Sequence, residues 1–596
     1  MKKMERQFKL SFIFLLLTTV GVFHTKAEIT KGNRSNEYTI HKTRTDGNQE
    51  APILLKHAEM IEAYADSILS KENPYNRADV YGKQADEYDA APISPILNGF
   101  MNDSAYADGQ TFLLEGGKTY YLDGNDGIHK GFVLRTDPKD VAEGKRARII
   151  CGIGKSTQLF DMGINGEQWN GGPYTMFMLG CSLEVGEENA ELCMKKLAFY
   201  DIDFDNPKAF NYGDQVAQMG NATGNYFMNM YNNGMGMTLD SLVIENCSFK
   251  RIVRGFIREQ GPNHKIWNHV LIKNNLFMDC GYYNQGAGGY PWIAGSGRYE
   301  NSNLYADFKV VGNTFYDSPF PSIFSEERGI EWESGIIWNI TFSNNTLINL
   351  NTRGNGSIFK MRNLPDGSVF NVENNLIVLC KQPEDIRVLE CYGADIRETW
   401  KADGSTGHVT LNFNNNWSTN NDLTNGQIFS ANPWTSNSNN FGKLVKNNQA
   451  TLNGSLEVNV ANISATDLMV QPCPPHVALT HSDQHMHRAD ALDGTASTAY
   501  NVNLHFQNTD AVRNSEIYKL GIGTSRWRTS VTDPESIEYI QTTVSFKGSA
   551  TVYNVSGCMV RKVVIENGHS LKSCLVGLPS GLYLIRINDE VIKMMK

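Results

Sequence analysis

The 596-residue sequence lacks the cysteine spacings that would build a structural or metal-binding framework. Its ten cysteines are scattered from Cys151 to Cys574, and no two of them form a CxxC pair. Cys247, Cys280 and Cys380 each lie in or beside an apolar run, where cysteine usually behaves as a small hydrophobic side chain. The pattern therefore favours buried thiols over a disulfide scaffold or a zinc site.

The sequence also lacks an excess of basic residues. It has 54 Lys and Arg against 64 Asp and Glu, a formal charge of -10. Residues 1–27 hold five basic residues and one acidic residue, so removing their +4 leaves -14. An acidic surface disfavours non-specific binding to nucleic acid or to anionic lipid.

After residue 27 no segment has 18 consecutive apolar residues, so the sequence predicts no transmembrane segment in the mature chain. The first 27 residues differ from the rest. The basic stretch MKKMERQFK precedes an apolar run from Leu10 to Phe23, and Thr25-Lys26-Ala27 follows. Small residues at Thr25 and Ala27 occupy the positions that a signal peptidase reads. We therefore predict that residues 1–27 are a signal peptide and that the protein is exported.

Residues 28–90 are polar and charged, with one helical pattern near 51–70. From Phe199 onward a short sequence phrase recurs along the chain. The phrase is an apolar residue, a variable one, two Asn-like residues, a variable one and an apolar residue. Its markers are separated by 45, 28, 38, 32 and 30 residues, which indicates loops inserted into a repeating unit. The copies are FYDIDF (199–204), IENCSF (244–249), IKNNLF (272–277), VVGNTF (310–315), FSNNTL (342–347), VENNLI (372–377) and FNNNWS (413–418).

The phrase has a specific physical meaning. Two apolar strands flank a short bend, and Asn tolerates the left-handed conformation that such a bend needs. Stacked Asn side chains can also hydrogen-bond to the copies above and below. A further apolar strand follows each copy, for example GFIREQ at 255–260. Three short strands per turn predict a parallel β-solenoid, whereas leucine-rich repeats and propellers have different spacings.

These repeats resemble the right-handed parallel β-helix of pectate-lyase-like proteins. The region 91–530, with LLEGGKTYYL near its start and GIGTSRW at 521–527, is similar to secreted Bacteroidetes β-helix proteins. The resemblance implies an all-β fold in which residues 91–530 form the helix. It implies no activity by itself, because many functions share one fold.

The C-terminal residues carry a second resemblance. The segments TVYNVSGCMVRKV (551–563), GLPSGLYLIRI (577–587) and EVIKMMK (590–596) resemble the sorting domain that the type IX secretion system reads. Their alternating strands and their SG and PSG turns predict a small β-sandwich over 531–596. The resemblance implies the type IX machinery as a partner, and release into the medium or attachment to the outer-membrane cell surface. The alternative is a terminal β domain that only caps the solenoid.

In the pectate-lyase-like family, the Asn bend separates the second and third strands of each coil, and the next strand belongs to the first sheet, which carries the substrate groove. By this register Arg258 and Lys360 lie on groove strands, and Arg362 follows two residues after Lys360. If Ile257 faces inward, these cations face outward, but the neighbouring Phe256 column is also apolar, so a one-residue slip would exchange the faces.

A cationic strip on an acidic protein suits an anionic sugar chain. β-Elimination from a uronate needs a base, for which Arg258 and Lys360 are the candidates, and a group that neutralises the carboxylate. Glu326 is the candidate general acid, and Arg362 and Glu390 are candidates for substrate binding. Glu327 is a candidate ligand for Ca²⁺, which prefers oxygen donors. The alternative is a solvated ladder of paired charges.

Two tryptophans are candidates for stacking on sugar rings. Trp292 follows the Gly-rich segment 281–289, and Trp332 lies in the loop after Glu327. The apolar faces of sugars pack on such rings when the rings are exposed. The alternative is that both rings pack against the solenoid.

The sequence thus predicts a carbohydrate-active protein that acts on acidic polysaccharide, with a polysaccharide lyase as the enzymatic form. The alternative is a non-catalytic glycan-binding or adhesin-like surface protein. The family's catalytic motifs are missing: there is no WxDH-like or RxxPxxR segment, and Asn508-Thr509-Asp510 stands without the other polygalacturonase motifs. No catalytic residue is therefore carried over from the family.

Overall fold

The structure is a computed structural model. It describes residues 29–31, 38–40, 52–68, 90–102, 108–122, 128–151, 175–179, 191–205, 226–231, 236–250, 252, 255–260, 265–278, 280, 292–294, 304–316, 318, 323–326, 337–348, 359–361, 367–378, 408–420, 450–454, 458–472, 503–528, 548–554, 559–565, 575, 578, 582–587 and 590–595. The predicted signal peptide, residues 1–27, lies outside this set.

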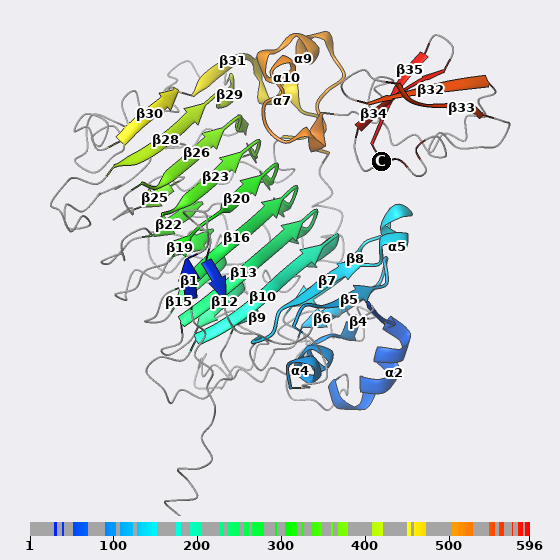
Figure 1. Cartoon of the computed structure of the whole chain (residues 1–596), viewed down its shortest axis with the longest axis vertical. Coiled ribbons are helices and arrows are strands. Elements are labelled where there is room, and N and C mark those ends of the chain that lie inside the picture. The colour runs from blue at the N-terminus through cyan, green and yellow to red at the C-terminus, as the bar shows by residue number, and fades with distance from the viewer. Residues whose placement is uncertain are drawn as a thin grey trace, which may run out of the picture. The chain divides into compact units, whose positions relative to one another are not determined.

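The parallel strands described between residues 53 and 464 form a right-handed parallel β-helix, and the predicted fold class is confirmed (Figure 1). Strands of three sheets succeed one another along the chain, and each pairs in parallel with its counterparts in the neighbouring coils. The first sheet contains β9 (Thr175–Met178), β12 (Tyr226–Tyr231), β15 (Gly255–Gln260), β18 (Ile293–Ala294), β22 (Phe324–Glu326) and β25 (Phe359–Met361).

The second and third sheets are longer than the first. The second contains β3 (Ile53–Leu55), β5 (Gln110–Leu114), β7 (Phe132–Thr136), β10 (Glu191–Tyr200), β13 (Gly236–Glu245), β16 (Lys265–Lys273), β20 (Phe308–Val311), β23 (Asn339–Ser343), β26 (Val369–Glu373), β28 (Val409–Asn414) and β30 (Ala450–Gly454), with β19 (Leu304–Tyr305) beside β16. The third contains β4 (Ala90–Pro92), β6 (Thr119–Leu122), β8 (Ala147–Cys151), β11 (Ile202–Asp205), β14 (Ser248–Lys250), β17 (Leu276–Met278), β21 (Thr314–Tyr316), β24 (Thr346–Ile348), β27 (Leu376–Val378), β29 (Trp417–Asn420) and β31 (Asn459–Ser464).

Each bend between the second and third sheets has the left-handed backbone that the repeated phrase predicts. Its first Asn-like residue has a φ between 54° and 57°, or 69° where it is glycine. The left-handed conformation costs Asn less free energy than it costs most residues, and it costs Gly almost none. The positions are Asp201, Asn246, Asn274, Gly312, Asn344, Asn374 and Asn415.

In the five bends from Asn274 to Asn415, the residue after the left-handed position is an asparagine, and these asparagines build a buried ladder inside the solenoid. The Asn313 amide donates to the carbonyl of Ile272 at 2.8 Å and to Asn345 Oδ1 at 3.1 Å, while Asn313 Oδ1 accepts from the backbone of Asn275 at 2.9 Å. The same bonds recur through Asn345, Asn375 and Asn416. Because the side-chain amides of this ladder are paired, the ladder avoids the cost of desolvation without a partner.

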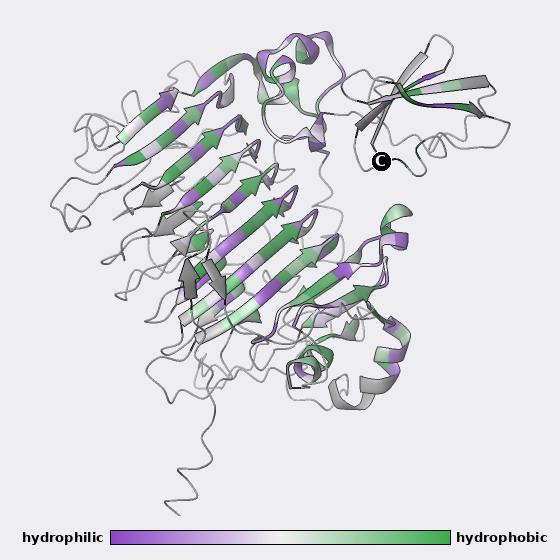
Figure 2. Ribbon diagram, in the orientation of Figure 1, coloured by the Kyte–Doolittle hydropathy of each residue, from purple (hydrophilic) through white to green (hydrophobic). Residues whose placement is uncertain are grey.

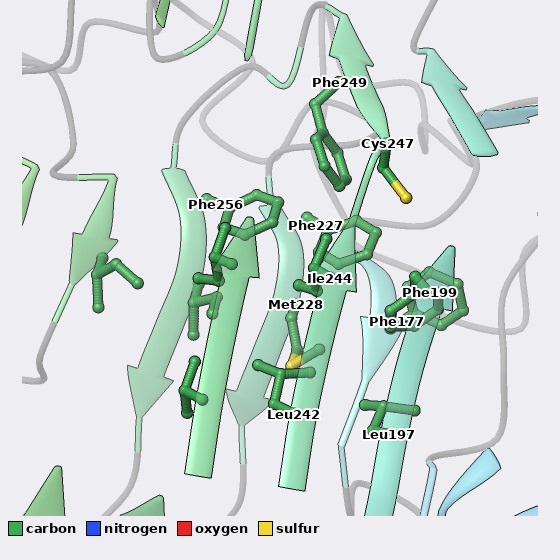
Figure 3. Close-up of a cluster of buried hydrophobic side chains, with 14 of the residues drawn as sticks. Phe177, Leu197, Phe199, Phe227, Met228, Leu242, Ile244, Cys247, Phe249 and Phe256 are labelled. Carbon is green, nitrogen blue, oxygen red and sulfur yellow. The ribbon is translucent and has the colours of Figure 1, made fainter. Parts of the chain in front are cut away.

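The interior of the middle coils contains two aromatic stacks; Phe249 of one stack, and Phe227 and Phe256 of the other, are labelled in Figure 3. Rings in one stack repeat at 4.9–5.1 Å, the spacing of the coils, and rings of facing stacks meet edge-to-face, as Phe249 and Phe256 do at 4.8 Å and 78°. The third-sheet stack contains Phe204, Phe249, Phe277 and Phe315, and the first-sheet stack contains Phe227, Phe256 and Trp292. Apolar and polar residues alternate along the strands as a two-faced sheet requires (Figure 2).

The N-terminal end of the solenoid is closed by helices. The helical pattern predicted near 51–70 is confirmed as α2 (His57–Ile68), and the preceding β3 extends the second sheet beyond the range predicted for the solenoid. A second helix, α4 (Ser94–Asn102), follows β4 and buries Leu97, Phe100 and Met101 in the core. Lys130 Nζ donates to the Phe100 carbonyl at 3.0 Å, near the negative end of the α4 dipole. A short helix, α5 (Pro138–Ala142), precedes β8.

A segment from the C-terminal part of this unit crosses the outer face of the third sheet. After α7 (Ala465–Leu468), α9 (Asp510–Asn514) and α10 (Glu516–Lys519), residues 521–528 form a strap that includes the 3-10 turn η5 (Ser525–Trp527). Gly523 N donates to the Asn374 carbonyl at 2.7 Å, and Thr524 N donates to Thr346 Oγ1 at 3.0 Å. Trp527 Nε1 donates to Thr314 Oγ1 at 2.7 Å. The strap therefore joins successive coils of the solenoid.

The C-terminal residues form a separate unit, 529–596. Its described part is one antiparallel sheet in the order β33 (Met559–Ile565), β32 (Gly548–Asn554), β34 (Leu582–Ile587) and β35 (Glu590–Met595). Ala550, Val552 and Ile585 are buried on this sheet. The second layer of the predicted β-sandwich is not among the described residues. A small antiparallel pair, β1 (Ile29–Lys31) with β2 (Tyr38–Ile40), lies in the N-terminal part of the chain.

We predict that the strap is required for the stability of the coils beneath it. Trp527 is 7% exposed, so Trp527→Ala should lower the free energy of unfolding by about 3 kcal/mol through the lost packing and the lost bond to Thr314. Gly523→Ala should also destabilise, because its φ is 78° and a Cβ there would lie 2.6 Å from Thr346 Oγ1. Urea unfolding of each variant measures the effect.

The matched control is Leu520→Ala, because Leu520 precedes the strap and is 52% exposed. It should change the free energy of unfolding by less than about 0.5 kcal/mol. Equal midpoints for Trp527→Ala and Leu520→Ala would contradict a stabilising strap.

Candidate functional site

Parts of two outer faces of the solenoid are engaged by the chain's own groups. The strap lies on the third sheet, against Thr314 and close to Leu376. On the second sheet the exposed amides bond to one another, since Asn412 Nδ2 donates to Asn371 Oδ1 at 2.6 Å and Asn453 Nδ2 donates to Asn412 Oδ1 at 2.8 Å. The first sheet is therefore the face on which we place the candidate site.

One column of the first sheet contains both cations that the sequence singles out. Arg258 pairs with Asn229 on one side and with Ala294 on the other, and Ser325 pairs with Ala294 and with Lys360. Arg258 and Lys360 thus occupy equivalent positions three strands apart. At about 4.8 Å per strand their backbones are separated by about 14 Å, enough for a chain of several sugar units. We call Asn229, Arg258, Ala294, Ser325 and Lys360 the cationic column.

The structure resolves which face of β15 points outward. Phe256 and Ile257 are both buried in the core, and the backbone N–H groups of both donate to the carbonyl of Trp292. Arg258 is half-buried, and Glu259 is only 1% exposed. Alternation therefore places Ile257 and Glu259 on the inner face and Arg258 on the outer face, as the sequence predicts when Ile257 faces inward.

Arg258 is positioned by an aromatic ring. Its guanidinium carbon lies 5.3 Å from the ring centroid of Tyr226, at the start of the neighbouring β12. A cation over a ring face gains about 0.5–2 kcal/mol, depending on how far it is desolvated. A guanidinium has the planar geometry that bidentate bonding to a carboxylate requires.

The inner face of the same strand holds a buried polar cluster that the sequence analysis missed. Tyr305 Oη donates to Glu259 Oε2 at 2.7 Å, and Lys265, at the start of β16, is 2% exposed. Burial lowers the pKa of Lys265 to about 8, and the Glu259 carboxylate opposes this shift. We call Glu259, Lys265 and Tyr305 the inner cluster.

The inner cluster explains why β15 has one register. The neighbouring columns of Phe256 and Ile257 are both apolar, so hydrophobicity alone does not choose between two parities. A slip by one residue would move Glu259 away from Tyr305 and turn Arg258 into the core. The buried carboxylate therefore fixes Arg258 on the outer face, a use of buried charge for specificity rather than for stability.

The other residues predicted to form the site are not all on the outer face of the first sheet, and several lie outside the described residues. Trp292 is fully buried and stacks on Phe256 at 5.0 Å and 3°, so the prediction that its ring offers an exposed platform for sugars is wrong. Trp292 immediately precedes β18, and its ring joins the first-sheet stack. Glu326 lies in β22 one residue beyond Ser325, outside the cationic column. The side chains of Glu326 and Lys360 are outside the described residues, as are Glu327, Trp332, Arg362 and Glu390.

The described residues do not supply a calcium site. Among them, no three His, Cys, Asp or Glu side chains lie close enough to hold a metal ion. Ca²⁺ binding at Glu327 therefore stays a prediction, and no step of the proposals below depends on a metal.

Comparison with known proteins adds no assignment: the chain matches no protein-family model, and neither a curated protein nor a solved structure matches it. Among the described helices, none is long and apolar enough to cross a membrane. The function is therefore argued from the geometry of the first sheet.

We predict that Lys265 makes the stability of the solenoid rise in mildly alkaline solution. Its folded pKa of about 8 is below the usual 10.5, so between these values the unfolded chain binds a proton that the folded chain has released. The free energy of unfolding should then rise by about 2 kcal/mol from pH 7.5 to 9.5 on account of this group.

The reference for this measurement is the double variant Glu259→Gln/Lys265→Met, which removes both charges of the inner cluster. The free energy of unfolding of each protein is measured by chemical denaturation at several pH values. The parent value minus the variant value isolates the contribution of the inner cluster, because all other titrating groups are shared. If this difference in the free energy of unfolding stays constant or falls between pH 7.5 and 9.5, Lys265 is not a desolvated cation at neutral pH.

Proposed function

We propose that this protein is a secreted or cell-surface carbohydrate-active protein that binds an acidic polysaccharide along the outer face of the first sheet. The observation that carries the proposal is the cationic column, in which Arg258 and Lys360 share one register position on strands three apart. A polyuronate presents carboxylates at regular intervals along an extended chain. A column perpendicular to the strands matches such a chain better than it matches a compact anion.

Charge and geometry both favour an anionic chain over a neutral one. The sequence is acidic, with a formal charge of -10, so the two cations that share this register position differ in sign from the protein as a whole. The two cations attract carboxylates locally, against the general repulsion of polyanions by the acidic remainder of the protein. Arg258 is also held in place by Tyr226, which reduces the entropy lost when it binds a carboxylate.

Within this proposal the column favours binding more directly than catalysis. Between the two cations it carries Ala294 and Ser325, neither of which is an effective general base without an activating partner. A polysaccharide lyase would use Arg258 or Lys360 as the base and Glu326 as the acid, with Arg362 and Glu390 binding the substrate. The appearance of unsaturated products, followed by ultraviolet absorbance, distinguishes the lyase from the non-catalytic glycan-binding protein.

We predict that Arg258→Ala and Lys360→Ala each weaken binding to a polyuronate by about tenfold, the loss of one charge-assisted hydrogen bond. The probes are polygalacturonate, alginate and hyaluronan, with dextran as the neutral reference, in affinity gels at low and high salt. The loss should shrink at high salt, because exposed charges are screened. Circular dichroism should show that both variants remain folded.

Lys309→Ala is the matched control. Lys309 is an exposed cation on β20 of the second sheet and bonds to Asp307 at 2.8 Å, so its removal changes the net charge equally but leaves the first sheet intact. The proposal is wrong if the parent binds none of the three polyuronates. It is also wrong if Lys309→Ala weakens binding as much as Arg258→Ala does.

The export part of the proposal rests on the sequence of residues 1–27 and on the resemblance of residues 531–596 to a type IX sorting domain. We predict that a chain ending at residue 530 is cleaved near Ala27 and is retained in the periplasm, whereas the full chain reaches the cell surface or the medium. Fractionation and surface proteolysis measure this. Surface display of the truncated chain would contradict the sorting role.

A further inference from the structure

Three residues with the chemistry of an acyl-transfer site lie side by side on the second sheet. Ser241 of β13 pairs with His269 of β16, and the next residue, Val270, pairs with Phe308 of β20 (Figure 1). Asp307 precedes Phe308, so it is the neighbour of His269 on the opposite side from Ser241. Successive strands are about 4.8 Å apart. We call Ser241, His269 and Asp307 the serine column.

The serine column lies on the outer face of the sheet. The residues that follow its members, Leu242, Val270 and Phe308, are all buried in the core, so alternation turns the column outward. The side chain of His269 is 50% exposed and that of Asp307 is 29% exposed. A group that projects from a large molecule can therefore reach the imidazole without any rearrangement of the protein.

The Asp307 carboxylate faces one nitrogen of the imidazole. Asp307 Oδ2 lies 3.6 Å from His269 Nδ1, slightly beyond the length of a hydrogen bond, and it also accepts from Lys309 Nζ at 2.8 Å. Hydrogen bonds of a catalytic site are often long before substrate binds and shorten in the complex. With its proton on Nδ1, towards the carboxylate, a neutral His269 presents the lone pair of Nε2 as a base.

Ser241 lies between this base and a cation. Among the described residues no hydrogen bond joins Ser241 to His269, but at the spacing of neighbouring strands a change of χ1 brings the Oγ towards the next imidazole. On its other side Ser241 pairs with Lys196 of β10, whose ammonium can offset negative charge that develops beside the serine. The sequence thus supplies a nucleophile, a base, a carboxylate and a cation in register on four successive strands.

We propose that the serine column is the active site of a serine esterase that hydrolyses esters carried by a polysaccharide. Ser241 is the nucleophile, His269 is the general base and then the general acid, and Asp307 is the positioning residue. This activity goes beyond the binding proposed for the first sheet, and it rests on a different face of the solenoid.

The reaction has two halves. Ser241 Oγ attacks the ester carbonyl carbon while its proton passes to His269 Nε2, and Lys196 stabilises the oxyanion that forms. The bond from carbon to the alcohol oxygen then breaks, and His269 gives the proton to the departing alkoxide. Water next attacks the acyl-serine, its proton passes to His269, and Ser241 Oγ departs and takes that proton back. One ester and one water become one carboxylic acid and one alcohol.

Two features favour an ester of a sugar chain as the substrate. The column is open to water, which weakens electrostatic stabilisation of a transition state, so a reactive ester suits it better than an amide. Tyr200 lies on the same outer face of β10 and is half-buried, with Lys196 Nζ 6.0 Å from the centre of its ring. The apolar face of a sugar packs on such a ring.

The first test asks whether Ser241 is a nucleophile. The purified full chain is treated with a fluorophosphonate, which reacts with activated serines, and the labelled peptide is identified by mass spectrometry. We expect the label on Ser241 in the parent and labelling that is about a hundredfold slower in His269→Gln. Ser343→Ala is the matched control, because Ser343 lies on β23 of the same sheet beside Val311 and Glu373, and its labelling pattern should equal that of the parent. A parent without label on Ser241 would overturn the proposal.

The second test is the hydrolysis of p-nitrophenyl acetate. Ser241→Ala should hydrolyse it no faster than buffer does, and Lys196→Ala should lower kcat by about tenfold through the weaker stabilisation of the oxyanion. Asp307→Asn should also lower kcat by about tenfold or more with KM little changed, because Asp307 acts through His269 and touches no substrate. A lower thermal midpoint with unchanged kcat in Asp307→Asn would show a merely structural role. Equal rates in the parent and Ser241→Ala would contradict the esterase.

Three polymers identify the ester. O-acetylated polygalacturonate and acetylated xylan release acetate if an ester of a sugar hydroxyl is cleaved, and methyl-esterified polygalacturonate releases methanol if an ester of the uronate carboxyl is cleaved. The parent, and not Ser241→Ala, should release one of these products. If Ser241 hydrolyses p-nitrophenyl acetate but none of the polymers, the polysaccharide ester is the wrong substrate class. Failure of polyuronate binding at the first sheet leaves the result with p-nitrophenyl acetate unaffected, so the two proposals fail separately.

Discussion

The architecture depends on one constraint, which is that the chain must turn sharply between two buried strands in every coil without leaving a polar group unpaired. The turn needs a left-handed residue, and it exposes amide groups to a dry interior. In four coils two consecutive asparagines meet both needs, since the first takes the positive φ and the second bonds to neighbouring coils; Gly312 with Asn313 does the same in a fifth. The ladder aligns successive coils, and that alignment places Arg258 and Lys360 in one column of a different sheet.

The repeated phrase was sufficient to predict the fold because it reports on contacts that recur at each coil. The left-handed positions, the strands that flank them and the following first-sheet strand all lie within one short stretch of sequence. The columns of the first sheet were predicted from the apolar strand that follows each bend, since aligning these strands with one another shows which residues are equivalent.

The orientation of β15 and the inner cluster could not be read in the same way. Phe256 and Ile257 are both apolar, so the period-two pattern that normally assigns faces is ambiguous. The contact that resolves it joins Glu259 to Tyr305, which is 46 residues away in a different sheet. Trp292 was assigned to the surface because it follows a Gly-rich segment, yet the stack of Phe256 and Phe315 draws its ring inside. Long-range packing decided each case.

The strap has a consequence for the order in which the chain can fold. Trp527 bonds to Thr314, 213 residues earlier in the sequence, and it is one of the last residues of the solenoid unit to be synthesised. The coils that it covers are complete long before it exists, and until then the outer face of the third sheet, with Leu376 close beneath the strap, has no cover from this segment. A newly made chain therefore passes through a state in which the coils are wound but not fastened, and such a chain is easier to unwind than the finished protein.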